Sequence, residues 1–138
     1  MIALADVERD VVIVVCGISA GIHAALTPEH LAEGFPPGLG FAASAFLLAG
    51  LAIVLTRRPA SVSAFGAAAI VLSGLLVSYA LATTTGLPLL HPEAEPVDGL
   101  ALATKAIEAA GLLAAVHHST RSRQALTAAH SLPKGTLT

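Results

Sequence analysis

Charged residues are scarce in this chain of 138 residues. Lysine, arginine, aspartate and glutamate together make up 12% of it, against 55% hydrophobic residues. An ordinary soluble domain carries about 25% charged residues. So few charges cannot coat a water-exposed particle of this size, and the mean hydropathy of +0.81 argues equally against intrinsic disorder. The composition therefore predicts that lipid, and not water, surrounds most of the molecule.

Cysteine and basic residues are also few, and each shortage excludes a class of site. The single cysteine, Cys16, excludes an internal disulfide and a cysteine-built zinc site, so we expect it to be a small core residue. Seven Lys and Arg residues against nine Asp and Glu residues give a formal net charge of −2. That balance disfavours a nucleic-acid-binding surface. The sequence also lacks the Gly-x-x-x-x-Gly-Lys loop that cradles nucleotide phosphates.

Four apolar segments are long enough, or nearly so, to cross a bilayer. They cover residues about 7–26, 39–56, 60–84 and 97–118, and a spanning helix needs about 20 apolar residues. These segments are rich in Ala, Leu and Gly and do not alternate polar with apolar residues, which disfavours strands. We predict an all-α, four-helix transmembrane bundle formed by residues 1–119 as a single domain, followed by a polar, frayed tail over residues 120–138.

Proline and glycine mark the expected turns. Thr27-Pro28 is typical of a helix start, so we expect the first span to end there and a short separate helix to follow, up to Gly34. The Phe35-Pro36-Pro37-Gly38 stretch is then expected to redirect the chain. Within the first span, Gly17-x-x-x-Gly21 is a small-residue pattern that favours close helix packing.

The basic residues predict the orientation of the bundle. Six of the seven Lys and Arg residues fall on one side of the membrane if the chain crosses it four times, and the positive-inside rule assigns that side to the cytoplasm. We therefore expect a multi-pass protein of the plasma membrane with both termini cytoplasmic. The first ten residues are net negative, unlike the start of a cleaved signal peptide, so the first span is expected to be retained. The six residues are Arg9, Arg57, Arg58, Arg121, Arg123 and Lys134.

Ionisable residues inside the spans are the strongest pointers to a site. Lys105 and Glu108 lie near the middle of the fourth span, at i,i+3 spacing on one helix face. A charge at the bilayer centre costs roughly 2.5–3.5 kcal/mol on insertion scales, so this face must turn inward. Asp98 lies on nearly the same stripe, and the long stem of Lys105 can reach toward the depth of Tyr79 and His23. We predict a polar pocket of these five residues; the alternative is an ion pair that only fixes helix packing or contacts a partner subunit.

A second set of polar residues falls at the outer side of the predicted topology. Imidazole and carboxylate groups together suit divalent transition metals, so this set predicts a metal site. The alternative interpretation is that these acids only solvate the loops and favour helix starts. The candidate ligands are His23, Glu29, His30, Glu33, His91 and Glu93.

Two stretches resemble segments of a known group of proteins. The first is His-Ala-Ala-Leu-Thr-Pro-Glu-His-Leu at residues 23–31, and the second comprises Thr-Thr-Gly-Leu-Pro at 84–88 with Glu-Pro-Val-Asp-Gly-Leu at 95–100. Both are similar to segments of small, four-span bacterial integral membrane proteins for which no activity is known. The resemblance runs over most of residues 11–118. It implies the same topology and transfers no catalytic role to any residue.

These observations predict a binding or accessory subunit of a membrane assembly. Its partners would be the lipid bilayer and either further copies of the chain or other membrane subunits, with no nucleic acid, and handling of a metal ion is one form that this role can take. An enzyme is less favoured. The competing class is an electron-transfer module or membrane enzyme that binds haem or a quinone at the same pocket.

Overall fold

The computed structural model describes residues 4–87, 94 and 96–131. It is all-α, and its four helices are long and apolar enough to cross a membrane, which confirms the predicted fold class and a multi-pass membrane protein. The helices are α1 (Leu4–Glu33), α2 (Phe35–Arg57), α3 (Val62–Thr84) and α4 (Gly99–Ser131).

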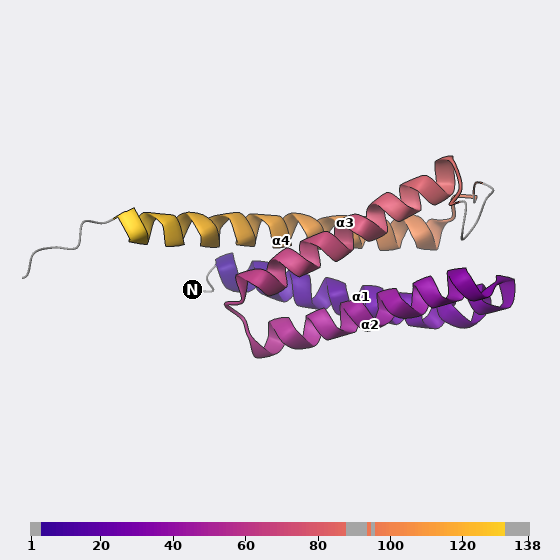
Figure 1. The fold of residues 1–138 in the computed structure, drawn as a ribbon, viewed down its shortest axis with the longest axis horizontal. Coiled ribbons are helices and arrows are strands. Elements are labelled where there is room, and N and C mark those ends of the chain that lie inside the picture. Colours follow the sequence, from indigo (N-terminus) through magenta and orange to yellow (C-terminus); the bar gives the residue numbers. More distant parts are fainter. Residues whose placement is uncertain (1–3, 88–93, 95, 132–138) are drawn as a thin grey trace, which may run out of the picture.

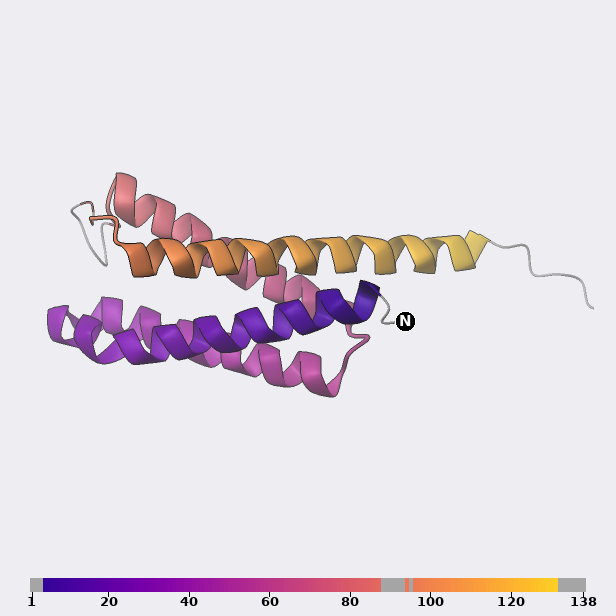
Figure 2. The same ribbon diagram turned by 180° about the vertical axis from the view of Figure 1, so that it is seen from behind.

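The helices form two hairpins that meet along α1 and α4 (Figures 1 and 2). The first hairpin consists of α1 and α2, which contact each other along their length; the second consists of α3 and α4. Helix α2 makes few contacts with α3, which runs obliquely across the bundle. The start of α1 and the turn between α2 and α3 share one end of the bundle, here called the termini end, and the opposite end is the far end.

Helix α1 is longer than the sequence predicts. It continues through Pro28 to Glu33 without the expected break after the first span. Pro28 has no backbone N–H and cannot bond to the carbonyl four residues earlier, but one missing bond does not end this helix. The hydroxyl of Thr27 donates to the carbonyl of His23 at 2.8 Å, so Thr27 lies inside the helix and does not cap a new one.

The turn between α1 and α2 is also tighter than predicted. Gly34 alone separates the two helices, and Pro36 and Pro37 already belong to the first turn of α2. Proline is compatible with that place because first-turn N–H groups have no partner within the helix. The two helices then lie so close that a Cβ on Gly38 would come within 2.7 Å of the Cα of Leu31.

Helices α3 and α4 begin at polar caps. The Ser61 hydroxyl accepts a hydrogen bond from the N–H of Ala64 at 3.3 Å, and the Asp98 carboxylate accepts one from the N–H of Ala101 at 2.8 Å. Helix α4 then continues to Ser131, so the first part of the predicted tail is helical and not frayed. Residues 132–138 lie outside the described part.

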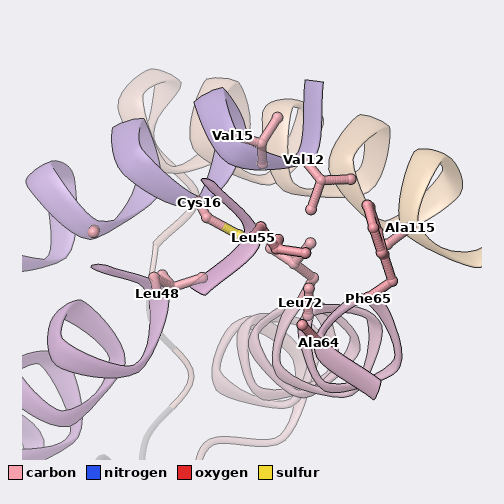
Figure 3. Packing of buried hydrophobic residues seen from close by; sticks show 11 residues of the cluster. Val12, Val15, Cys16, Leu48, Leu55, Ala64, Phe65, Leu72 and Ala115 are labelled. Carbon is pink, nitrogen blue, oxygen red and sulfur yellow. The ribbon is translucent and has the colours of Figure 1, made fainter. Parts of the chain in front are cut away.

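Hydrophobic residues from all four helices form the core (Figure 3). Cys16 is fully buried in it, as predicted. Gly111 of α4 lies close against α1, since a Cβ there would lie 2.9 Å from the Cβ of Val15. Gly17 and Gly21, by contrast, are exposed, and a Cβ at either would meet nothing within 4 Å, so this pair of glycines marks no close helix contact among the described residues.

Candidate functional site

Glu108 is the most deeply buried charged residue described in the structure. It lies in the middle of α4 with 0% exposure, and its Oε2 accepts a hydrogen bond from Lys105 Nζ at 2.7 Å. The i,i+3 spacing on one helix places the two charges side by side. The Lys105 side chain keeps 16% of its surface exposed, so the pair has one buried and one partly accessible partner.

Ser19 of α1 donates a hydrogen bond to the second oxygen of this carboxylate. Its hydroxyl donates to Glu108 Oε1 at 2.6 Å, which joins the two hairpins across the middle of the bundle. Ser19 is 1% exposed. Both carboxylate oxygens therefore receive a donor, which is the condition for keeping a buried carboxylate charged.

His23 lies one turn further along α1 and is also buried. Its Nδ1 donates to the backbone carbonyl of Ser19 at 2.8 Å, and that contact places the proton of a neutral ring on Nδ1. The Nε2 atom is then the acceptor. The imidazole packs at 5.4 Å between ring centroids against Phe41 of α2, so this helix also takes part in holding the site.

Tyr79 connects α3 to this site, so all four helices contribute to it. The Lys105 ammonium lies 5.7 Å from the centre of the Tyr79 ring, within the range of a cation–π interaction. The phenolic oxygen is buried and makes no hydrogen bond within the described residues. We call Ser19, His23, Tyr79, Lys105 and Glu108 the central cluster.

Asp98 does not belong to the central cluster. It is exposed, and its carboxylate serves as the cap of α4. The sequence predicts that Asp98 lies on the same helix face as Lys105, but its backbone precedes the first helical residue, Gly99, so helical periodicity does not extend to it. Ser19 was missed instead, although its i,i+4 spacing to His23 could have drawn attention to it.

The predicted metal ligands do not assemble over the part of the chain that the structure describes. No group of three His, Cys, Asp or Glu side chains there is placed to hold a metal ion. His23 belongs to the central cluster. His30 stacks on Phe41 at 3.6 Å and its Nδ1 donates to the carbonyl of Leu26 at 2.9 Å, while Glu29 and Glu33 are exposed. His91 and Glu93 lie outside the described residues.

Two hollows on the surface of the bundle lie away from the central cluster. One, of about 450 Å³, lies between α1 and α2 beside Ala24 and Phe46. The other, which is smaller, lies at the end of α2 beside Arg57. Neither of the two is lined by a residue of the central cluster.

The arrangement is unsuited to nucleophilic catalysis. Ser19 stands in the sequence Gly17-Ile-Ser-Ala-Gly21, whose spacing matches that of the nucleophile elbow of hydrolases. That elbow is a turn between a strand and a helix, whereas Ser19 lies in the middle of α1. Its proton is directed to Glu108, and the His23 nitrogen 3.4 Å from its oxygen is the one that already donates to a carbonyl. What the central cluster offers is hydrogen-bond donors at the buried middle of a membrane bundle.

Comparison with known proteins identifies no relative of this chain. No family model matches the chain, and neither a curated protein nor a solved structure shows significant similarity to it. A function for this chain is therefore inferred from its own geometry.

Proposed function

We propose that this chain is an accessory subunit of a membrane assembly, in which Lys105 receives an oxygen acceptor from a neighbouring subunit. The observation that carries the proposal is the unequal pairing of Lys105 and Glu108. Glu108 has a donor on each oxygen, whereas the ammonium of Lys105 has three N–H donors and one acceptor among the described residues. A partly exposed ammonium with unused donors fits a carboxylate, hydroxyl or carbonyl on a partner helix.

The surroundings of Lys105 support a partner that lies within the membrane. Leu102 is 53% exposed on the neighbouring turn of α4, and Leu113 further along is more exposed still. A ligand dissolved in water would have to cross this apolar surface, whereas a helix packed against α4 meets Lys105 directly. Polar groups that bond across helices are a known means of helix association in lipid.

The remaining parts of the proposal rest on the sequence. Basic residues favour a plasma-membrane protein with cytoplasmic termini, and the resemblance to small four-span bacterial proteins supports the same placement. A metal-handling form of the role receives no support from the described residues. A haem would need a second imidazole opposite His23, whose neighbours are Ser19 and Phe41.

Site-specific photo-crosslinking in native membranes tests the proposal. A photoreactive amino acid at exposed Leu102 should give a crosslinked product of defined mass, which we expect to fall at least fivefold in Lys105→Met and to return in Lys105→Arg. The matched control is the same probe at Ile70 of α3, which is 75% exposed and should respond to neither substitution. A Leu102 product that Lys105→Met leaves unchanged, or the absence of any product, would refute the proposed role.

A further inference from the structure

The turn between α2 and α3 carries two arginines without an ion-pair partner. Arg57 ends α2 and Arg58 follows it, and both side chains are exposed. Within the described part of the chain, neither forms a salt bridge. Two other arginines at the same end of the bundle differ from them. Arg9 pairs with two neighbouring aspartates, and Arg121 Nη1 lies 3.6 Å from the carboxylate of Glu8.

Acidic residues are absent from the sequence on both sides of this turn. Residues 34–92, which include α2, the turn and α3, contain no Asp or Glu. The positive charge of the two arginines therefore has no counter-charge on the helices that they join. A favourable interaction with the negative end of α2 accounts for a basic residue in its last turn. That interaction requires neither a second arginine nor a cavity beside the first.

A hollow of about 290 Å³ lies directly beside Arg57. It is lined by Ala52, Ile53, Thr56 and Arg57, whose spacing places them on one face of α2. The Thr56 hydroxyl donates to the carbonyl of Ala52 at 2.8 Å, so it adds no free donor to the hollow. The lining thus changes from apolar at Ala52 to cationic at Arg57 within about 8 Å along the helix axis.

This change coincides with the place where α2 leaves the hydrocarbon of a bilayer. The helix has 23 residues, which gives a length of about 34 Å, against a hydrocarbon thickness of about 30 Å. Its last turn, at the termini end of the bundle (Figure 1), therefore lies at the level of the lipid headgroups. A lipid phosphate at this level meets the arginines, and the acyl chain beyond it meets Ala52 and Ile53.

We propose that this hollow binds an anionic phospholipid. Arg57 and Arg58 hold its phosphate, because the planar N–H array of a guanidinium forms two parallel hydrogen bonds to phosphate oxygens. One acyl chain lies against Ala52 and Ile53. A zwitterionic lipid carries its own cation next to the phosphate and gains less from two arginines. The lipid site is separate from the central cluster and does not require the partner proposed for Lys105.

Fluorescence quenching by brominated lipids in reconstituted vesicles tests this proposal. The chain contains no tryptophan, so a single Val54→Trp substitution, at a 41% exposed position one turn before Arg58, reports the lipids beside the hollow. We expect brominated phosphatidylglycerol to bind there at least fivefold more strongly than brominated phosphatidylcholine. One basic residue near an anionic surface favours binding by about that factor.

Three variants of the Val54→Trp chain locate the preference. Arg57→Gln combined with Arg58→Gln should lower it to twofold or less. The matched control, Arg123→Gln, removes one positive charge from an exposed position of α4 at the same side of the bundle and should leave the preference unchanged. Ala52→Leu keeps every charge but fills the apolar part of the hollow, so it should lower the preference at least twofold.

Four results would overturn the proposal. The first is equal quenching by the two lipids in the Val54→Trp chain. The second is an equal loss of preference in Arg123→Gln and in the double arginine variant, which would show diffuse attraction to any anionic surface. The third is an unchanged preference in Ala52→Leu. The fourth is displacement of the brominated lipid by millimolar glycerol phosphate, which would show a phosphate site with no need of an acyl chain. The substituted arginines are exposed, so the decisive variants leave the core intact.

Discussion

Removing one residue of the buried ion pair in the central cluster affects stability differently from removing both. A buried ion pair replaced as a unit by apolar residues is often neutral or stabilising, but removal of one partner leaves an uncompensated charge in low dielectric. Glu108, with no exposed surface, cannot turn to water when Lys105 is lost. Lys105 is partly exposed and has more freedom to adjust.

This asymmetry predicts the outcome of a double-mutant cycle. We expect Lys105→Met, which leaves the fully buried Glu108 unpaired, to cost about 3–5 kcal/mol in the free energy of unfolding. Glu108→Leu, which leaves the partly exposed Lys105, should cost less, and the double variant should recover most of the loss. Unfolding of the purified protein in mixed micelles measures all three. Single and double variants whose losses simply add would show that the pair is not energetically coupled.

The sequence predicts most of the central cluster at the residue scale. His23, Lys105 and Glu108 are visible because ionisable groups inside apolar spans must turn inward. Ser19 was not predicted, because a hydroxyl in a helix is satisfied by its own backbone on any face, and only the packing of α1 against α4 reveals its bond to Glu108. Glu8 of α1 was also missed, because its partner His117 of α4 lies 109 residues away along the chain.

At the scale of helices, the close contact between α1 and α2 depends on Gly38 more than on the Gly17-x-x-x-Gly21 pattern. The chain reverses direction at Gly34 within a single residue, so the first turn of α2 must lie directly against the last turn of α1. A Cβ at Gly38 would overlap the Cδ2 and Cγ of Leu31 and would lie 2.7 Å from its Cα, so a shift of the Leu31 side chain alone does not relieve the overlap. The pattern Gly17-x-x-x-Gly21 correctly describes small residues but does not tell which face of α1 meets another helix.

Gly38→Ala should therefore destabilise the bundle by about 1–3 kcal/mol, the usual cost of overpacking. Gly40, two residues later on the same helix, is the matched control, because a Cβ there meets nothing within 4 Å. Gly40→Ala should be neutral or slightly stabilising, since alanine favours helix by up to 1 kcal/mol over glycine. Thermal unfolding in detergent compares the two, and equal effects would contradict the close contact with Leu31.

For the whole molecule, the number of spans follows from composition, but the contacts between them do not. Four apolar segments can be arranged in several ways around a common axis with the same hydropathy profile. The observed order, in which α1 meets α4 and α2 scarcely meets α3, depends on local shape, including the small residue Gly111 opposite Val15. The ends of α1 and α4 were mispredicted because proline and polar residues lower helix propensity without forbidding the helix.

The basic residues predict the placement of the whole molecule in the membrane. We expect a cysteine at Ala5 or Gln124 to be labelled by a membrane-impermeant maleimide only after cells are opened, and one at Ala32 to be labelled in intact cells, because the two ends of α1 face opposite sides. The Cys16→Ala background removes the native thiol. Labelling of Ala5→Cys in intact cells would reverse the predicted orientation.

The ion pair between Lys105 and Glu108 also affects how the fourth span is inserted into the membrane. The two residues neutralise each other within a single helix, at 2.7 Å, without help from any other segment. Ser19, although made long before, can reach Glu108 only after the last span has been synthesised and has moved beside the first. The nascent fourth span thus carries its own counter-charge when it leaves the translocon. Loss of either residue would therefore lower the efficiency of membrane insertion before it affects the stability of the folded protein.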